Sequence, residues 1–587
     1  MCGIIGYIGS KKPEKVLIDG LKTLEYRGYD SSGIALKNNH EIQIIKSVGK
    51  ISDLENKISK ENLIESNIGI AHTRWATHGV PNEINAHPHK VGKITIVHNG
   101  IIENAKELKQ ELEKHDIIFK SETDTEVICA LIDYYYKDNV IEAIEKTIKV
   151  LNGSYALGII VEDSNKLYAA RKDSPLLVGV GKDEMFIASD ISAIIKYTNN
   201  YFLLEDNEII ELSNTSFKVY KDNEEIKKEI LEIDRTEEAR AKGNYKHYML
   251  KEIMEEPFVF YKTIKPYLKD ITLLPNLSQY EEIHIIGCGS AMYAAYIGKS
   301  LIEEKAEIPC IVECASEYRY KKVLYNKKIL VILISQSGET ADTIAAMRKA
   351  KENHIPTLSI VNVKTSTIAR ECDENIFIEA GQEIAVATTK AFTLQVTMLS
   401  LLAIRSTIKE KELGLIEKEL IKIPHLIQEV LEKRDTYYKI AKKIYKEDNI
   451  FFIGRLIDYS ICLEGSLKLK EISYIHSEAY QAGELKHGTI SLIRDNTPVI
   501  GIITNDTIKE KTISNIEEVK SRGAYTIVIS NDNTSCGDIN LKLPKVSDYF
   551  QPLLIVPALQ LIAYEVAKLR GCDIDKPKNL AKSVTVE

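Results

Sequence analysis

The chain of 587 residues lacks paired cysteines, an excess of basic residues and a long apolar run. Its nine cysteines are scattered without a Cys-x-x-Cys pair, which argues against a zinc site or a disulfide framework and favours a reducing cytoplasm. A net charge of −8 argues against a broad nucleic-acid surface, which would be basic. Residues 1–10 carry no basic segment typical of a signal peptide. The most apolar run, around Leu394 to Ile404, is shorter than the ~20 residues of a membrane span.

The remaining composition is that of an ordinary globular protein. Hydrophobic residues make up 44% and charged residues 28% of the chain. At roughly 150 residues per domain, the length predicts three or four domains.

Cys2, at the start of the sequence (residues 1–6, MCGIIG), is a candidate nucleophile. Removal of Met1 would leave a thiol and a free α-amine on this one residue. An α-amine, with a pKa near ~7.7–8.0, can act as the base for the adjacent thiol. Gly3 and Gly6 flank an apolar strand at residues 4–8 and allow close approach to a substrate. The alternative, that Cys2 is an incidental second residue, stays open on this position alone.

The first 240 residues alternate short β-rich runs with helices, which predicts an α+β domain with antiparallel sheets. The expected strands are 36–48, 94–97, 155–161 and 185–188, and the expected helices are 103–114 and 140–151.

Residues 71–79 (AHTRWATHG) and 85–89 (NAHPH) hold four histidines in a short span. A metal site is not expected there, because no His-x-x-x-His helix or carboxylate partner pattern accompanies them. The planar guanidinium of Arg74 suits a substrate carboxylate. Trp75 is the single tryptophan of the chain and lies in a polar loop, where it could serve as a lid.

Two further polar clusters have both a chemical and a structural interpretation. Asn99 and Gly100 (HNG, 98–100) could form a two-donor oxyanion hole worth ~3 kcal/mol per donor, or a hairpin turn. Residues 123–126 (TDTE) form the pattern of a capping box that opens a helix at 127–136. Asp124 could hold a substrate ammonium there or simply cap the helix.

Together with residues 26–33 (YRGYDSSG), these motifs resemble the glutaminase domain of the class II, N-terminal-nucleophile, glutamine amidotransferases, which have an αββα fold. The resemblance implies that Cys2 is the nucleophile and that Asn99 and Gly100 form the oxyanion hole. It places Arg74 and Asp124 on the α-carboxylate and α-amine of glutamine. It adds to the glutamine site Thr77, His78 and His87, and makes Trp75 the gate of an ammonia channel.

The second half contains two strand–glycine–helix units, an internal duplication. The first copy comprises 283–290, 293–303, 328–334, 340–352 and 356–361; the second comprises 449–455, the helix holding 464–471, 498–503, 508–522 and 524–530. Apolar strands alternating with helices predict two doubly wound parallel sheets. The Gly-x-Gly at 287–289 lacks the rest of a dinucleotide fingerprint, so an NAD site is rejected.

Residues 335–340 (SQSGET) follow a buried strand and precede a helix, where hydroxyls and free N–H groups make an anion site. Residues 386–390 (VATTK) could line the same pocket, because both segments lie at the carboxyl edge of the sheet. The alternative is a pair of ordinary N-caps. The second copy carries 504–506 (TND) instead, so one phosphate site per chain is expected.

Three residues near the C-terminus are candidates for proton transfer or covalent chemistry. Glu471 and His487 lie in charged segments at 464–471 and 483–488 and could exchange protons. Lys582 lies in a tail apolar enough to dock, where a desolvated amine could form a Schiff base. By composition alone the two charged segments are simply a solvated helix and a loop.

This half resembles a pair of sugar isomerase (SIS) domains, and the whole chain resembles the family of isomerizing glutamine–fructose-6-phosphate aminotransferases. The resemblance implies a phosphate site, a Schiff-base lysine at Lys582, a proton shuttle between C1 and C2 at Glu471, and ring opening by His487 of the neighbouring subunit. The implied phosphate-binding and pocket residues are Ser335, Gln336, Ser337, Thr340, Ser290, Thr388 and Lys468. Ala291 and Thr388 depart from the serines common at those positions; only the first loses a hydroxyl.

The expected domains are a glutaminase domain at 1–238, a linker at 239–248, SIS domains at 249–425 and 426–572, and a tail at 573–587 that closes the sugar site. The implied reaction frees ammonia from L-glutamine and adds it to D-fructose 6-phosphate, giving D-glucosamine 6-phosphate, without metal, nicotinamide or pyridoxal. A cytoplasmic homodimer without nucleic-acid or membrane partners is expected. Other amidotransferases lack support, because no Ser-Gly-Gly-x-Asp loop and no acidic pair before a phosphate loop is present. The remaining alternative is a non-catalytic sugar-phosphate sensor.

Overall fold

The computed structural model describes residues 2–25, 28, 30–38, 41–75, 80–232, 242, 245–324, 327–407 and 416–585. The chain forms two compact units, Met1–Glu237 with Ser583–Glu587, and Glu238–Lys582. Of the predicted linker at 239–248, residues 239–241, 243 and 244 lie outside the described part, and helix α6 begins at Tyr248.

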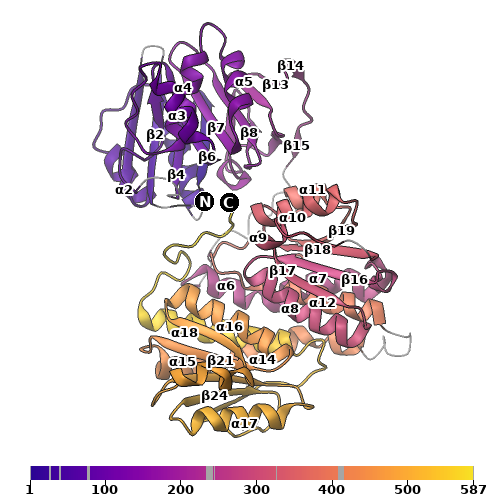
Figure 1. Cartoon of the computed structure of the whole chain (residues 1–587). Helices are drawn as coiled ribbons and strands as arrows, with labels where there is room; N and C mark the ends of the chain where they lie inside the picture. Colours follow the sequence, from indigo (N-terminus) through magenta and orange to yellow (C-terminus); the bar gives the residue numbers. More distant parts are fainter. Residues whose placement is uncertain are drawn as a thin grey trace. The chain divides into compact units, whose positions relative to one another are not determined.

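The first unit is a four-layer sandwich of two antiparallel sheets between two layers of helices (Figure 1). One sheet, in the order β15-β11-β9-β10-β1-β4-β2-β3, contains β1 (Gly3–Gly9), β2 (Ser31–Lys37), β3 (Ile42–Val48), β4 (Ile68–Arg74), β9 (Leu177–Val180), β10 (Glu184–Ala188), β11 (Asn200–Leu203) and β15 (Leu231–Glu232). The other, in the order β14-β13-β12-β8-β7-β6-β5, contains β5 (His89–Val91), β6 (Ile94–Ile102), β7 (Gly153–Val161), β8 (Leu167–Lys172), β12 (Ile209–Leu212), β13 (Phe217–Lys221) and β14 (Glu224–Ile226).

The alternation of side chains along β1 explains the layers. Ile5 and Tyr7 pack against α1 (Pro13–Leu24) and α2 (Ile51–Ile58) on the outer face of the first sheet. Ile4 and Ile8 point the other way and join the core between the two sheets. The helices α3 (Ala105–Glu113), α4 (Asp124–Tyr135) and α5 (Val140–Val150) cover the second sheet. The predicted αββα fold is confirmed.

One strand prediction in this unit was wrong, and one alternative that the sequence left open, a hairpin turn, is excluded. Residues 36–48 form parts of two strands, because β2 and β3 pair antiparallel with Lys37 opposite Ile42, and a short polar segment connects them. The pair Asn99-Gly100 lies inside β6, which continues to Ile102 opposite β7, and does not form a hairpin turn.

The second unit contains two parallel five-stranded sheets with the same strand order (Figure 1). The first, β17-β16-β18-β19-β20, is built from β16 (Glu282–Gly287), β17 (Cys310–Cys314), β18 (Ile329–Ser335), β19 (Thr357–Val361) and β20 (Glu374–Phe377). The second, β22-β21-β23-β24-β25, is built from β21 (Asn449–Gly454), β22 (His476–Gln481), β23 (Pro498–Ile503), β24 (Tyr525–Ser530) and β25 (Ile539–Lys542). The predicted duplication is confirmed, although the sequence pattern missed the edge strands β17, β20, β22 and β25.

The helices of this unit are α6 (Tyr248–Met254), α7 (Glu256–Lys269), α8 (Ser290–Leu301), α9 (Ala315–Tyr318), α10 (Ala341–Glu352), α11 (Thr367–Glu371), α12 (Lys390–Thr407), α14 (Ile423–Glu432), α15 (Arg434–Ile444), α16 (Ile457–Ser473), α17 (Lys509–Lys520) and α18 (Pro552–Arg570). Most of them pack into one core between the two sheets, whereas α9, α10 and α11 cover the outer face of the first sheet and α17 that of the second. The segment that follows the linker forms two helices, α6 and α7, because Pro257 at the start of α7 cannot donate a backbone hydrogen bond to continue α6.

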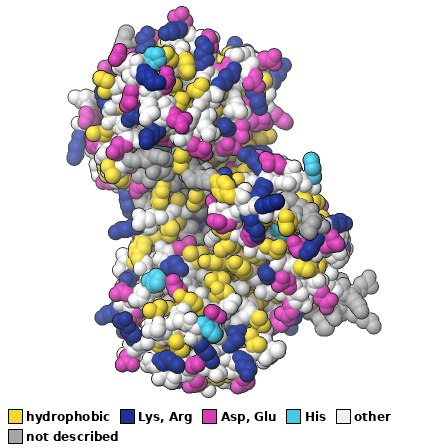
Figure 2. Space-filling model, in the orientation of Figure 1, with side chains coloured by type: hydrophobic (Ala, Val, Ile, Leu, Met, Phe, Trp, Pro, Cys, Tyr) yellow, Lys and Arg dark blue, Asp and Glu magenta, His cyan; other side chains and the backbone are white. Residues whose placement is uncertain are grey.

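By length and composition, α18 could cross a membrane, with a mean hydropathy of 1.5. However, 89% of its apolar window is buried inside the unit, so it is a core helix. On the face shown in Figure 2, acidic and basic side chains are interspersed over both units.

We predict that Gly33→Ala destabilises the first unit by about 2 kcal/mol. A Cβ at Gly33 would lie 2.3 Å from the backbone oxygen of His87, which cannot move without displacing its chain. Gly158→Ala should cost less, because its Cβ would meet only the ends of the Ile187 and Val97 side chains, at 2.9 and 3.0 Å. Urea unfolding followed by the fluorescence of Trp75 reports this unit selectively. Equal stability of the Gly33 variant and the wild type would contradict the prediction.

Candidate active sites

The thiol of Cys2 lies just before β1 and contacts the backbone at the end of β4. The N–H of Trp75 donates to Cys2 Sγ at 3.3 Å, and Sγ lies 3.5 Å from the carbonyl oxygen of Trp75. Burial raises the pKa of the Cys2 thiol, while the Trp75 N–H and the charge of Arg74 lower it. Because burial dominates, the thiol needs a base to become a nucleophile.

Asn99 and Gly100 approach Cys2 from the second sheet. Asn99 Nδ2 donates to the carbonyl oxygen of Cys2 at 3.1 Å, and Asn99 Oδ1 lies 3.0 Å from His72 Nε2, which fixes the amide orientation. Gly100 has φ = 141°, and a Cβ there would lie 2.0 Å from the backbone oxygen of Ser154. The position therefore requires glycine.

A cation and an anion lie close to this thiol. Arg74 is 3% exposed at the end of β4. Burial lowers its pKa, and the nearby charges of Cys2, Asp30 and Asp124 offset only part of this shift. Asp124 is the first residue of α4, and its Oδ2 accepts the N–H of Ile102 at 2.9 Å. A guanidinium and a carboxylate beside one thiol suit the α-carboxylate and α-ammonium of an amino acid.

The predicted capping box is only half formed. Thr123 is the N-cap of α4 and accepts the N–H of Glu126. The carboxylate of Glu126 does not return to Thr123 but accepts the N–H groups of Lys120 and Ser121 at 2.6–3.1 Å.

The histidines form a buried neutral cluster behind the site. His87 stacks on His72 with ring centroids 4.2 Å apart and lies 3.1 Å from Thr125 Oγ1. Burial lowers the pKa of His72 to about 3 and those of His87 and His89 well below their usual value. Among the described residues, no group of His, Cys, Asp and Glu side chains is arranged to hold a metal. The predicted glutamine ligands Thr77 and His78 lie outside the described residues.

The loop after β18 arranges the hydroxyls of the predicted phosphate site. Ser335 Oγ lies 3.2 Å from Thr340 Oγ1 and accepts the N–H of Gly338 at 3.0 Å. Ser337 Oγ accepts the N–H of Glu339 at 3.1 Å, and the carbonyl of Gln336 accepts the N–H of Asn362. A Cβ at Gly338 would lie 2.0 Å from Ser366 Oγ, so this tight turn requires glycine.

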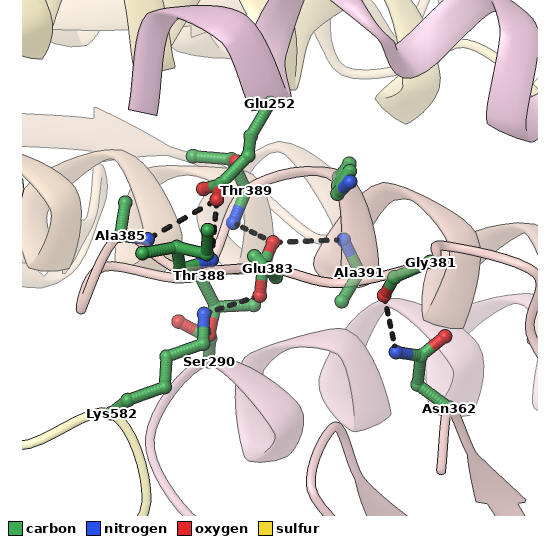
Figure 3. Close-up of polar contacts among 12 residues, drawn as sticks. Glu252, Ser290, Asn362, Gly381, Glu383, Ala385, Thr388, Thr389, Ala391 and Lys582 are labelled. Carbon is green, nitrogen blue, oxygen red and sulfur yellow. Dashed lines mark hydrogen bonds and ion pairs between the residues drawn. The ribbon is translucent and has the colours of Figure 1, made fainter. Parts of the chain in front are cut away.

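Lys582 is held in a closed ion pair with Glu383 (Figure 3). The two side chains are 4% and 0% exposed, and Lys582 Nζ also donates to Thr388 Oγ1 at 3.3 Å. The other oxygen of Glu383 accepts the N–H groups of Thr389 and Ala391 at 2.9 and 3.3 Å, at the start of α12. Burial alone would raise the pKa of Glu383, but the ammonium of Lys582 lowers it.

Further buried carboxyls fix the segment that carries Glu383. Glu252 on α6 accepts the N–H groups of Ile384 and Ala385 (Figure 3). Asp575, in the tail, accepts the N–H groups of Tyr248 and Met249 at 2.9 Å, and its backbone oxygen accepts the N–H of Val386 at 3.0 Å. The tail, α6 and this segment are thereby tied together.

A second charge cluster links the two sheets of the unit. Lys468 Nζ lies 3.5 Å from Glu464 and 2.5 Å from Glu471, and Glu464 accepts the hydroxyl of Ser290 at 3.1 Å. Burial raises the pKa of Glu464 to about 8. The pKa of Lys468 is raised to about 12 by Glu464, Glu471 and the charge of Glu383, which outweigh its burial.

The predicted sugar-site residues thus form three groups: the 335–340 loop, Lys582 with Thr388, and Lys468 with Glu471 and, through Glu464, Ser290. His487 ends a short 3-10 helix, Glu484–His487, and is exposed. Sequence reasoning missed Glu383, Glu464 and Glu252. Glu252 and Glu464 each stand among apolar helix positions, a pattern that marks a buried charge; Glu383 stands in a loop without such a signal.

Comparisons with known proteins agree with this division. The family model of the SIS domain matches residues 276–405 and 443–569, and that of the glutamine amidotransferase domain matches 72–196. The chain is 46% identical to a glutamine–fructose-6-phosphate aminotransferase (isomerizing) of Clostridium tetani and 42% identical to that of Thermus thermophilus, covering 100% of each protein. Among solved structures, the C-terminal domain of the glucosamine-fructose-6-phosphate aminotransferase from Francisella tularensis has a TM-score of 0.54 at 36% identity, covering 57% of this chain and 99% of that one.

We predict that the first unit loses stability as the pH falls below 6.5. The folded-state pKa of His72 is depressed from 6.5 to about 3, so the unfolded chain binds more protons in this window. From pH 6.5 to pH 5, His72 alone should cost about 2 kcal/mol. Urea unfolding at pH 7 and pH 5, followed by Trp75 fluorescence, measures this.

His89→Gln should reduce the pH dependence of stability, because it removes a histidine whose pKa burial lowers well below its usual value. The Gln side chain can still bond to Thr123 Oγ1, which lies 3.1 Å from His89 Nε2 in the wild type. His115→Gln, at an exposed position, should leave it unchanged. The same unfolding free energy at both pH values would refute the buried neutral cluster.

Proposed function

Because this chain belongs to the family of isomerizing glutamine–fructose-6-phosphate aminotransferases, we propose that Cys2 performs its glutaminase chemistry and Lys582 its sugar chemistry. The protein is a glutamine-dependent aminotransferase that converts L-glutamine and D-fructose 6-phosphate into L-glutamate and D-glucosamine 6-phosphate. The observation that carries the assignment is the buried thiol beside an amide donor, a guanidinium and a carboxylate.

In the glutamine half, Arg74 and Asp124 hold the α-carboxylate and α-ammonium of the substrate, with Thr77, His78 and His87 completing the site. The α-amine of Cys2, free once Met1 is removed, accepts the thiol proton. The thiolate attacks the side-chain amide, and the oxyanion accepts hydrogen bonds from Asn99 Nδ2 and the Gly100 N–H, each worth roughly 3 kcal/mol. Ammonia leaves, and water hydrolyses the thioester to glutamate.

In the sugar half, Ser335, Gln336, Ser337 and Thr340 bind the phosphate at the start of α10. His487, from the neighbouring subunit of a homodimer, assists ring opening, and Lys582 forms a Schiff base at C2. Glu471 then moves the proton between C1 and C2. Ser290, Thr388 and Lys468 line the same pocket, where Lys468 Nζ lies 2.5 Å from Glu471.

Free ammonia has to reach the sugar without becoming ammonium, which is not a nucleophile. We therefore propose a sheltered channel with Trp75 as its gate. The contact of the Trp75 backbone with Cys2 Sγ supports this, because movement of that loop would be sensed at the nucleophile. The tail at 573–587 closes the sugar site, and the enzyme works in the cytoplasm without nucleic-acid or membrane partners.

The alternative of a non-catalytic sugar-phosphate sensor has no support in the comparisons. Relatives that align over the full chain are named as aminotransferases, and Cys2, Glu471 and Lys582 are all present here.

We predict that Cys2→Ala abolishes glutamate release and glutamine-dependent product formation. Removing a nucleophile typically costs several orders of magnitude in rate. Cys536→Ala, a half-buried thiol of the second unit, is the matched control and should keep wild-type activity. Glutamate release is measured by a coupled dehydrogenase assay. Undiminished release from the Cys2 variant would exclude the nucleophile.

We also predict that two inactive variants restore each other when mixed. If His487 serves the neighbouring subunit, His487→Ala and Lys582→Ala homodimers each lack one required group in every sugar site. Heterodimers formed by unfolding and refolding the mixture contain one intact site, so product formation should recover to about a quarter of the wild-type rate, by random pairing of subunits. No recovery, despite heterodimers detected by mass, would assign His487 to its own subunit.

A further inference from the structure

We propose that Glu383 is a catalytic residue of the sugar half: its carboxylate takes the proton from Lys582 Nζ when the sugar binds and returns it to the oxygen that leaves C2. This inference rests on the proposed role of Lys582 as the Schiff-base lysine. Nothing in the sequence pattern or the family motifs singled out Glu383.

The first argument is contact and burial. Glu383 Oε2 pairs directly with Lys582 Nζ, and the two side chains are 0% and 4% exposed. An ammonium cannot attack a carbonyl, so Lys582 needs an acceptor for one proton before it can react. Water has little access to this pair, which leaves Glu383 as the acceptor in direct contact.

The second argument is the different setting of the two oxygens of Glu383 (Figure 3). Oε1 is anchored by the N–H groups of Thr389 and Ala391 at the start of α12. Oε2 faces Lys582 alone among the described contacts. One oxygen therefore holds the carboxylate still, while the other is available to gain and lose a proton.

The third argument excludes the neighbouring carboxylates. Glu464 and Glu471 both lie against Lys468, at 3.5 and 2.5 Å. Glu252 is bound to the N–H groups of Ile384 and Ala385, and its pKa is raised to about 8 by burial and by the charge of Glu383. Among the described residues, Glu383 is the carboxylate that contacts Lys582.

The proton and atom balance closes. Lys582 ammonium gives one proton to Glu383, and the resulting amine attacks the C2 carbonyl carbon of the open-chain sugar. A second proton moves from nitrogen to the former carbonyl oxygen, giving a carbinolamine. Glu383 then returns its proton to that hydroxyl, the C2–O bond breaks, and water leaves. The products are a protonated Schiff base, one water and the Glu383 carboxylate.

The test is borohydride trapping of the full-length enzyme with fructose 6-phosphate, with the labelled peptide identified by mass. Glu383→Gln keeps an oxygen for the Thr389 and Ala391 N–H groups but cannot take a proton. We expect trapping at Lys582 to slow at least about 100-fold, while the affinity for fructose 6-phosphate and the glutamate release of the first unit are retained. Glu383→Asp, which keeps the carboxylate, should trap at least about 10-fold faster than the Gln variant.

Glu379→Gln is the matched control, because Glu379 lies on the same segment in ion pairs with Lys262 and Lys364 at 3.1 and 3.0 Å, and should trap at the wild-type rate. A wild-type trapping rate in Glu383→Gln overturns the proposal. Equal losses in the Gln and Asp variants, or a loss that is entirely weaker sugar binding, also overturn it and assign Glu383 to holding the tail. Labelling of a lysine other than Lys582 in the wild type would instead reject the proposed function itself.

Discussion

The buried ion pair between Lys582 and Glu383 is the interaction on which the proposed chemistry of the second unit depends. Two desolvated charges are tolerated only when their remaining hydrogen-bonding groups are satisfied by a rigid scaffold. Here the scaffold consists of the α12 N-terminus, Thr388, and the Asp575 and Glu252 contacts that tie the tail and α6 to the same segment. The amine of Lys582, close to the end of the chain, is thereby held by contacts with the segment that precedes α12.

The first unit solves a related problem at the beginning of the chain. Cys2 directly precedes β1, which is hydrogen-bonded to β10 on one side and β4 on the other in an eight-stranded sheet. The same burial that fixes the position of the thiol also makes it less acidic, because burial raises its pKa. His72, which burial keeps neutral, fixes the orientation of Asn99 without adding a cation beside Arg74.

Burial raises the pKa values of carboxyl groups in the second unit and lowers those of histidines in the first, so it favours the neutral form in both cases. Glu464, Glu252 and Glu256 have pKa values raised to about 8 by desolvation, so they are largely uncharged at neutral pH. Glu383 is the exception because it has a cation in contact. Glu383 is therefore a charged carboxylate next to carboxyls that burial favours in the neutral form, and it faces Lys582.

Local pattern in the sequence by itself determined an α+β unit with antiparallel sheets, the duplicated parallel sheets, the nucleophile candidate and the hydroxyl-rich loop, because strand alternation, strand–glycine–helix units and turn residues act over a few positions; the αββα layering was implied only by the family resemblance. It could not place Asn99-Gly100 inside β6, since the dipeptide Asn-Gly is typical of hairpin turns and also fits a strand position that requires glycine. Only the tertiary structure decided that Glu383 meets Lys582, 199 residues away, and that Glu464 meets Ser290, 174 residues away. Such pairs depend on which loops converge at one sheet edge, and that convergence is set by the packing of the whole core.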